Sequence, residues 1–436
     1  MGKFCKTKIQ HANITKIENI KYTKVLKDKK LLIIGYVWPE PKSSAAGSRM
    51  MQLIDVFLSQ NYKITFASPC AKSDNAFNLK SIHVNTESIV LNDASFDVFI
   101  KRLNPKIVMF DRFMMEEQFG WRVSTQCPKA LKILDTEDLH CLRKGRHQAF
   151  KDGVEFNRSY LFSDIAKREI ASIYRCDLSL IISEVEMEIL KTNFKVSEDI
   201  LCYLPFMLDY ISENTTSRLP NFKQRLHFIT IGNFLHEPNY NAILYLKETL
   251  WPRIKKELPE AELHVYGAYT PQKVQQLHHV KQGFLIKGFV DQVAGVMQQA
   301  KVCLIPVRFG AGLKGKIVDA MQNGTPCVST TIGAEGMYGS LNPNGYIVNN
   351  ANDFVEKAVS LYTNSIHWEE FKTNGFAVIN KRFNKEKLQA KFLFTLKDTI
   401  NHLETKRQNN FTGQMLMHHT MQSTKFMSRW IEEKNK

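Results

Sequence analysis

The sequence has 436 residues, of which 44% are hydrophobic and 23% are charged, with a formal net charge of +16. This composition is typical of a globular protein of two or three domains, and no apolar run approaches the ~18 residues that a transmembrane helix needs. The absence of a signal-like apolar stretch and of any C-x-x-C pair argues against export, zinc motifs and redox motifs, so we expect a cytoplasmic protein without a cofactor.

The positive charge is concentrated at the two ends of the chain. Residues 1–30 hold nine lysines against two acidic residues, and residues 405–436 hold six basic residues against two acidic ones. Such ends are typical either of arms that bind an anionic surface, such as the inner face of a membrane, or of solvated flexible tails. They lack interleaved aromatic residues, so we expect no nucleic-acid partner.

Short apolar runs alternate with helical patterns from Leu31 onward. The helix expected at 45–60 places Met50, Leu53, Ile54 and Phe57 on one face at spacings of three and four. This alternation predicts a parallel sheet covered by helices. The expected strands are 31–36, 63–68, 106–111, 130–135 and 178–182.

The alternation breaks at the polar segment 209–225, which contains a proline and is interpreted as a linker. It then restarts with a strand at 226–232 and a helix through 239–259. Two such blocks in succession predict an α/β protein with two facing Rossmann-like domains, whose ligand lies in the cleft between them. The further strands expected are 261–267, 284–290, 301–307 and 325–331.

The loop "RFGAGLKGKIVDA" (308–320) matches two phosphate-binding motifs at once. Gly310, Gly312 and Gly315 fit the dinucleotide pattern G-x-G-x-x-G, and Gly310, Gly315 and Lys316 fit most of the P-loop pattern. The dinucleotide interpretation lacks an acid at the end of the next strand. The P-loop interpretation lacks a hydroxyl, because Ile317 stands where Ser or Thr binds Mg²⁺.

A third interpretation also uses the charged residues of this loop. Arg308, Lys314 and Lys316 surround the glycines just before a predicted helix, where free N–H groups attract phosphate. Asp319 lies one helical turn after Lys316 and suits a ribose diol. Together these residues predict a nucleotide-sugar site, although basic side chains also decorate ordinary tight turns.

The stretch "RFGAGLKGKIVDAMQNGTPCVSTTIGAEGM" resembles the donor-site signature of the retaining GT-B glycosyltransferases of family four, the glycosyl transferases group 1. The stretches "YVWPEPKSSAAGSRMMQLIDVFL" and "TIGNFLHEPNYNAILYLKETLWPRIKKELPEAELHVYG" resemble the openings of that family's two domains. The resemblance implies a GT-B fold with a C-terminal helix that returns to the first domain. The expected segments are a basic extension 1–29, a first domain 30–208, a linker 209–225, a donor domain 226–383, a crossover helix 384–403 and a basic tail 404–436.

The resemblance also assigns roles to single residues. Asp319 stands where the family binds ribose, and Arg308, Lys314 and Lys316 stand near the donor diphosphate. The other implied donor contacts are Gly47, Gly310 and Gly312 for phosphate, Phe289 and Val290 for the base, and Gly333 and Glu335 for the transferred sugar.

The sequence departs from the family pattern at several positions. Ala311 replaces a Glu that contacts the sugar, and Asn233 and Asn239 replace an Arg and a Lys. Where many members carry a His after the strand 130–135, this chain has "TEDLH". The expected catalytic residues are therefore His140 and Asp138.

These features predict transfer of a sugar from a nucleotide-diphosphate sugar to an unknown glycan, a lipid-linked molecule or a small-molecule acceptor. The resemblance implies retention at the anomeric carbon. No Asp-x-Asp occurs in the chain, so we expect no metal. The alternative is a catalytically degenerate protein that binds nucleotide sugars on the same fold.

Overall fold

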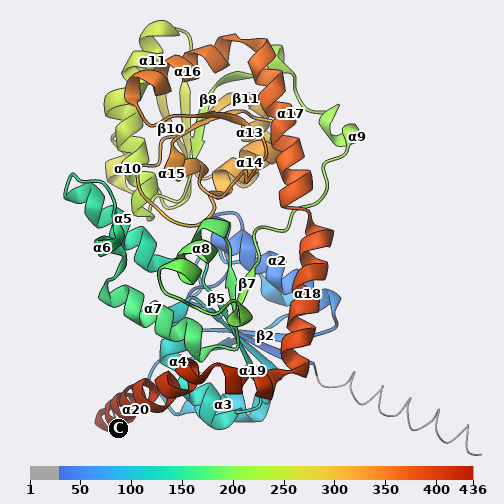
Figure 1. Ribbon diagram of the computed structural model, residues 1–436. Helices are drawn as coiled ribbons and strands as arrows, with labels where there is room; N and C mark the ends of the chain where they lie inside the picture. Colours follow the sequence, from blue (N-terminus) through green and yellow to red (C-terminus); the bar gives the residue numbers. More distant parts are fainter. Residues whose placement is uncertain (1–28, 436) are drawn as a thin grey trace, which may run out of the picture.

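The computed structural model describes residues 29–435 and contains two α/β domains, one above the other in Figure 1. The first domain has a seven-stranded parallel sheet in the order β3-β2-β1-β4-β5-β6-β7. All five strands predicted for this domain are present, and the sequence analysis missed only the short strands β3 and β7. The strands are β1 (Lys30–Ile34), β2 (Lys63–Ser68), β3 (Asn85–Ser88), β4 (Ile107–Asp111), β5 (Leu131–Asp135), β6 (Leu178–Ile181) and β7 (Leu201–Tyr203).

Helices cover both faces of this sheet, because its central strands are apolar on both sides. The predicted face of α2 is buried, and the Ser44 side chain caps this helix by accepting a hydrogen bond from the Gly47 amide. The helices are α2 (Ala45–Ser59), α3 (Ser95–Leu103), α4 (Phe113–Gln126), α5 (His140–Lys151), α6 (Arg158–Leu161), α7 (Asp164–Arg175) and α8 (Glu184–Thr192), with short 3₁₀ turns at Leu79–Ile82 and Glu198–Ile200.

The second domain repeats this architecture with a six-stranded parallel sheet in the order β10-β9-β8-β11-β12-β13. Two doubly wound domains confirm the predicted fold class. The strands are β8 (Leu226–Ile231), β9 (Leu263–Tyr266), β10 (Phe284–Gly288), β11 (Ala300–Ile305), β12 (Cys327–Ser329) and β13 (Gly345–Ile347). The helices are α10 (Glu237–Tyr245), which continues through a π-helical turn (Leu246–Leu250) into α11 (Trp251–Glu257), then α12 (Gln272–Gln275), α13 (Val293–Gln299), α14 (Gly315–Gln322), α15 (Thr331–Ala334), α16 (Ala351–Thr363) and α17 (Ser365–Arg382), with a 3₁₀ turn at Val280–Gln282.

The segment between the domains contains α9 (Glu213–Thr216) and a 3₁₀ turn (Phe222–Gln224). Arg225 at its end is fully buried and donates hydrogen bonds to the Thr325 hydroxyl (2.8 Å) and the Asn323 carbonyl (2.8 Å). A buried cation with several partners fixes the point where the second sheet begins.

The chain returns to the first domain after α17, as the fold class predicted (Figure 1). Helix α18 (Lys385–Asn401) buries Phe392 and Leu396 in the first domain's core, and the Phe392 and Phe57 rings meet edge to face at 5.8 Å. Among the described helices, none has both the length and the apolar composition that a bilayer crossing requires.

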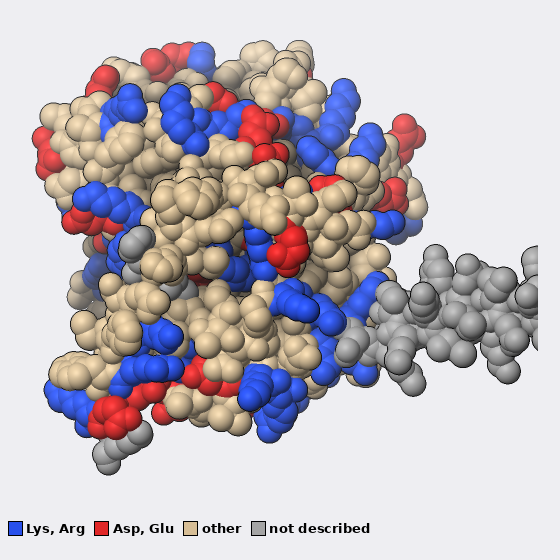
Figure 2. All heavy atoms as spheres, turned by 60° about the horizontal axis from the view of Figure 1, so that its bottom comes forward, with Lys and Arg blue, Asp and Glu red and all other residues tan. Residues whose placement is uncertain are grey.

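Of the two interpretations of the basic C-terminal end, the solvated flexible tail does not hold for the part of the tail that the structure describes. After α19 (Leu403–Asn409), α20 (Phe411–Lys434) packs against α4 and α7 (Figure 1). Arg122 of α4 donates to the buried Ser428 hydroxyl at 3.0 Å and pairs with Glu432. The sequence analysis missed this docking because the partners lie about 300 positions away. The basic extension 1–28 lies outside the described residues. Lys and Arg alternate with Asp and Glu over the face in Figure 2.

Candidate functional site

A cavity of about 930 Å³ lies between the two domains, at the carboxyl ends of both parallel sheets. This is where ligands of doubly wound sheets bind. The first domain contributes the residues after β1, β4 and β5 and the start of α2. The second domain contributes the turns after β8, β9 and β10 and the glycine-rich loop before α14.

The glycine-rich loop needs its glycines in order to approach the first domain. Gly310 and Gly312 have positive φ angles of 152° and 66°. A Cβ on Gly312 would lie 2.9 Å from the Asp138 Cβ, and a Cβ on Gly315 would lie 2.6 Å from that of Ala45. The Gly312 amide also donates to the buried Glu186 carboxylate at 2.8 Å. The loop is therefore part of the contact between the domains.

Two lysines of this loop line the cavity, but they have different surroundings. The Lys314 amine donates to the carbonyls of Ala311 (3.0 Å) and Gly312 (2.7 Å), so it holds the loop itself. The Lys316 amine donates to the Asn239 side chain at 2.7 Å, and burial lowers its pKa to about 8. Of the two lysines, Lys316 therefore makes no hydrogen bond to the loop's own backbone.

Asp319 lies one turn after Lys316 on α14 and also lines the cavity. Burial raises the pKa of this carboxyl to about 7, although Lys316 acts in the opposite direction. A carboxyl group that accepts no hydrogen bond from the described residues can receive hydroxyl groups from a ligand.

The remaining predicted donor contacts that line the cavity are Gly47, Phe289 and Val290. Gly47 lies in the first turn of α2, where a Cβ would approach the Glu40 carbonyl oxygen to 2.3 Å. Phe289, which follows β10, is 43% exposed. A partly exposed aromatic ring at a cavity edge suits stacking against a base.

Arg308 and Gly333 are not among the residues that line the cavity, and their donor contacts stay predictions. The Arg308 Nε donates to Asn241 at 2.9 Å, and its guanidinium stacks over Tyr245 at 4.3 Å. Gly333 lies against Ser329, whose hydroxyl would be 2.3 Å from an added Cβ. The Arg308 guanidinium also lies over the Phe150 ring of α5 at 4.7 Å, so this side chain lies at the contact between the domains. Gly333 is buried within its own domain.

Glu335 is likewise outside the cavity lining, because it is engaged by the first domain. Arg146 of α5 binds both of its carboxylate oxygens, at 2.6 and 2.7 Å, and also donates to the Gly310 carbonyl at 2.9 Å. This bidentate pair joins α5 to the second domain.

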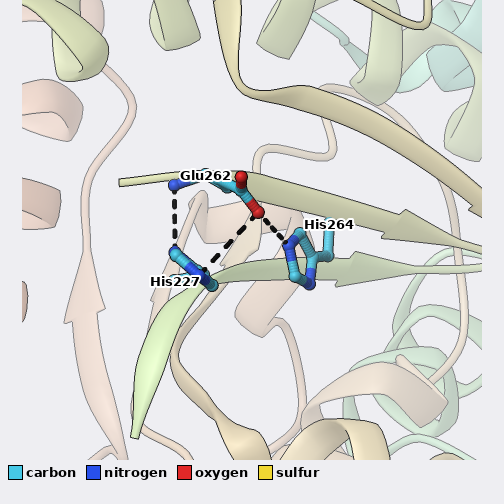
Figure 3. Close-up of side chains that lie close together, drawn as sticks. All are labelled: His227, Glu262 and His264. Carbon is cyan, nitrogen blue, oxygen red and sulfur yellow. Dashed lines mark hydrogen bonds and ion pairs between the residues drawn. The ribbon is translucent and has the colours of Figure 1, made fainter. Parts of the chain in front are cut away.

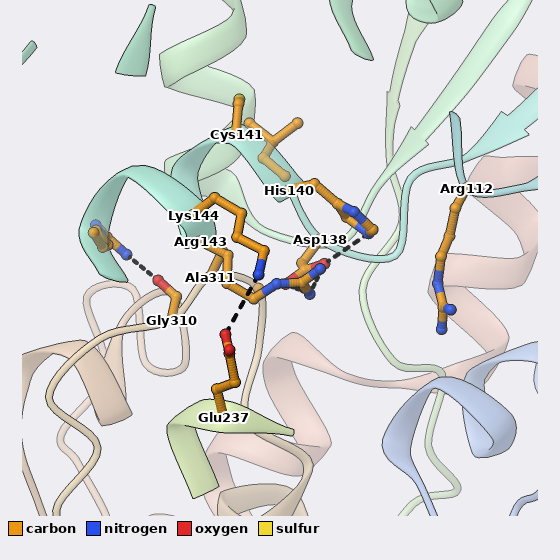
Figure 4. A network of polar contacts seen from close by, with 12 residues as sticks. Arg112, Asp138, His140, Cys141, Arg143, Lys144, Glu237, Gly310 and Ala311 are labelled. Carbon is orange, nitrogen blue, oxygen red and sulfur yellow. Dashed lines mark hydrogen bonds and ion pairs between the residues drawn. The ribbon is translucent and has the colours of Figure 1, made fainter. Parts of the chain in front are cut away.

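The two predicted catalytic residues are close together, but only Asp138 lines the cavity. Burial alone would raise the pKa of Asp138, but the Arg143 guanidinium at 2.6 and 2.7 Å and His140 lower it to about 2 (Figure 4). The His140 Nε2 lies 3.6 Å from the Asp138 carboxylate, and burial lowers the His140 pKa to about 3. Asp138 is therefore ionised at neutral pH, and His140 is uncharged.

The sequence analysis missed several polar residues of the cavity wall. Three of them come one or two positions after a strand, and this position was the available clue. Arg143 lies within α5, and His236 comes directly before α10. The missed lining residues are Tyr36, Arg112, Glu137, Arg143 and His236.

A second polar cluster lies away from this cavity, at the amino-terminal ends of β8 and β9 (Figure 3). His264 bonds Glu262 at 2.7 Å, and the His227 Nδ1 accepts the Glu262 amide hydrogen at 3.2 Å. These residue types can ligate a metal. However, the His227 Nδ1 accepts a hydrogen bond, so the proton of the neutral ring is on Nε2. This Nε2 faces the Glu262 carboxylate at 3.8 Å. The cluster is satisfied as a hydrogen-bonded link between two strands.

Residues 225–364 match the family model of the glycosyl transferases group 1. The second domain is therefore similar to the glycosyl transferases group 1. A curated relative, an uncharacterized 44.6 kDa protein in the cps region of Klebsiella pneumoniae, is 22% identical over 165 residues, which are 36% of this chain. The chain spans about two fifths (42%) of that relative's length.

Solved structures of similar fold extend the likeness to both domains. Sucrose-phosphate synthase from Thermosynechococcus elongatus has a TM-score of 0.62 at 14% identity, over 85% of this chain and 99% of its own. Anabaena HepE in complex with UDP and glucose has a TM-score of 0.61 at 13% identity, over 85% of this chain and 100% of its own. The predicted resemblance is confirmed, and the two-domain arrangement is the GT-B fold of these neighbours.

Proposed function

We propose that this protein is a glycosyltransferase that moves a sugar from a nucleotide-diphosphate sugar to an acceptor. One observation carries the proposal. Lys316 and Asp319 lie on the first turns of α14, directly after a glycine-rich loop, and face the interdomain cavity. The first domain lines the opposite side of this cavity with the first turn of α2, which contains Gly47. A cation, free N–H groups and a carboxyl one turn away are the chemistry that a diphosphate and a ribose require.

This arrangement of residues supports one orientation of the donor along the cavity. The diphosphate lies at the amino end of α14 with Lys316, and the ribose hydroxyls reach Asp319. The base lies against Phe289 and Val290. The transferred sugar then points toward Asp138, which approaches the donor loop at Gly312 and carries a charge that can accept sugar hydroxyl groups.

The reaction depends on stabilising the leaving nucleoside diphosphate. Negative charge develops on the phosphate as the glycosidic bond breaks, and preorganised N–H groups and Lys316 oppose that charge. We propose retention at the anomeric carbon and a reaction without metal, in which these cationic groups supply the charge. The domain contacts through Arg146 and Glu186 would limit the access of water to the donor.

The nucleotide is tested by thermal unfolding with UDP, GDP, ADP and CDP. UDP is the first candidate, because the similar structure of Anabaena HepE is a complex with UDP and glucose. One nucleotide at 100 times its Kd should stabilise the protein by about 2.7 kcal/mol. Lys316→Ala serves as the matched control, and wild-type protein that no nucleotide stabilises would contradict the proposal.

A catalytically degenerate nucleotide-sugar-binding protein is the second candidate, favoured by one observation. Ala311 is an apolar, largely buried residue at the loop position where a carboxylate would reach the sugar. Slow hydrolysis of the bound nucleotide sugar in the absence of acceptor separates the two. A transferase hydrolyses its donor at a measurable rate, and a binding protein leaves it intact.

Association with an anionic membrane surface is proposed for the basic extension alone. Residues 1–29 carry a strong positive excess, and each lysine near such a surface contributes about 1 kcal/mol. Sedimentation with vesicles of increasing anionic lipid should show binding that fades at high salt and is lost on deletion of residues 1–28. Vesicle binding that is unaffected by salt and by the deletion would contradict a membrane role of the basic extension.

A further inference from the structure

Two residues at the first domain's cavity wall follow the ends of neighbouring strands. Arg112 follows the last residue of β4, and Glu137 follows β5 by two positions. The strands pair in parallel with Asp111 opposite Asp135, so both residues emerge at the same edge of the sheet. Both line the interdomain cavity.

Both residues hold backbone conformations that side chains disfavour. Arg112 has φ 73° and ψ 154°, a region occupied almost exclusively by glycine, and Glu137 has φ 62°. Conformations of this kind persist where the surrounding structure imposes them, and they cluster at ligand sites. Here the strain directs two charged side chains into one cavity.

Arg112 differs from two neighbouring arginines of the first domain. Arg49 binds Asp135 at 2.9 Å, and Arg143 binds Asp138 at 2.6 Å. The Arg112 guanidinium donates no hydrogen bond to any side chain or carbonyl within residues 29–435. Among the described residues, Asp111 at 3.7 Å is its one ion pair within 4 Å, the charges of Glu137 and Asp138 also act on it, and it lies over the Tyr36 ring at 5.2 Å. Figure 4 shows Arg112 apart from the Asp138 network.

Glu137 is an unpartnered carboxyl group beside it. It is 9% exposed and, among the described residues, accepts no hydrogen bond. Burial first, and then the charges of Asp135 and Asp111, raise its pKa well above the ordinary value. A protonated carboxyl can both donate a hydrogen bond to a hydroxyl group and accept one.

We propose that Arg112 and Glu137 form an acceptor subsite for a molecule that carries an anionic group, a carboxylate or a phosphate, next to a hydroxyl group. The guanidinium binds the anion and Glu137 binds the hydroxyl. This inference rests on the proposed transferase function. The pair belongs to the acceptor because it lies on the first domain, whereas the donor's diphosphate has its own cation and helix terminus on the second domain.

The test measures calorimetric binding of matched probes to the nucleotide-loaded protein. The pairs are methyl glucuronide against methyl glucoside and glycerol 3-phosphate against glycerol. The anionic member of at least one pair should bind about tenfold tighter or more, because a charge-assisted hydrogen bond is gained. Equal binding within both pairs, or no binding of either anionic probe, would overturn the subsite.

Variants locate the selectivity at these two residues. Arg112→Gly suits the local backbone and should fold with an unchanged or higher melting temperature, yet lose the preference for the anionic probe. Glu137→Gln should keep the preference, and Glu137→Ala should weaken both members of a pair. The exposed Arg102→Gln on α3 is the charge-matched control. A preference that survives Arg112→Gly contradicts the assignment.

A separate measurement distinguishes the acceptor from the donor as the source of the anion. Nucleotide affinity of Arg112→Gln should stay within about twofold of wild type, because the donor phosphates lie on the other domain. A loss of nucleotide affinity as large as that of Lys316→Ala would show that Arg112 binds the donor, and would overturn the proposal. If the wild-type protein binds none of the nucleotides, the proposed function itself is contradicted.

Discussion

The two walls of the cavity use charge in opposite ways. On the first domain, opposite charges are paired: Arg49 and Asp135 are bonded to each other in the interior behind the wall, and on the wall itself Arg143 holds Asp138. On the second domain, burial pushes Lys316 and Asp319 toward their neutral forms, to pKa values of about 8 and about 7.

This difference separates groups that hold the fold from groups that await a ligand. A saturated buried pair loses much when one partner is removed, since the other charge is left uncompensated. A buried charge with few partners costs stability in the empty protein and regains it when a ligand supplies the missing partner. Arg112 and Glu137 are the exceptions on the first wall, which is why they are assigned to a ligand.

The largest expected effect is on stability, from Arg49→Met. Loss of the guanidinium leaves Asp135 buried without its partner and should lower the free energy of unfolding by about 3–5 kcal/mol. Urea unfolding measures the change. The double variant Arg49→Met with Asp135→Leu should recover most of the loss, and a single variant as stable as wild type would remove the distinction between the walls.

Lys316→Ala should show the reverse pattern. Loss of a charge-assisted hydrogen bond to the diphosphate costs about 1.5–3 kcal/mol, which is a 10- to 150-fold loss of nucleotide affinity. The melting temperature of the empty protein should stay constant or rise, because a buried cation has been removed. Calorimetry with the nucleotide found in the panel gives the affinity, and wild-type affinity in a folded variant would refute the site.

Asp319→Asn should make the stability of the empty protein less dependent on pH. The raised pKa means that the native state holds a proton between pH 4 and pH 7 that the unfolded chain releases, so stability is lost as pH rises through about 7. The variant should gain about 1–2 kcal/mol over wild type at pH 8, since solvent near the partly buried side chain reduces the effect of the shift, and nothing at pH 4. Melting curves at the two pH values measure this, and an equal gain at both would show that the carboxyl is not the cause.

Arg308→Ala should have the smallest effect. Its guanidinium contacts Asn241 and Tyr245 outside the cavity, so stability should fall by about 0.5–1 kcal/mol while nucleotide affinity stays within about twofold. The same calorimetric measurement as for Lys316→Ala makes the comparison. A large loss of nucleotide affinity in Arg308→Ala would show that Arg308 binds the donor.

Sequence patterns predicted most strands, the two domains and the chemistry of the α14 loop, because each of these signals lies within a short stretch of chain. Buried parallel strands are apolar on both faces, and a helix shows its buried stripe at spacings of three and four. The short strands β3, β7 and β13 carry too few residues for such a pattern, and the docking of α20 rests on Arg122 and Ser428, about 300 positions apart.

The sequence by itself determined that a basic glycine-rich loop precedes a helix in the second of two Rossmann-like domains. Only the tertiary structure decided which of its charges face the cavity: Lys316 and Asp319 do, Arg308 turns to Tyr245, and Glu335 is taken by Arg146 from the other domain. A side chain in a loop takes the direction in which a partner satisfies it, and these partners come from other strands and helices that local sequence does not place.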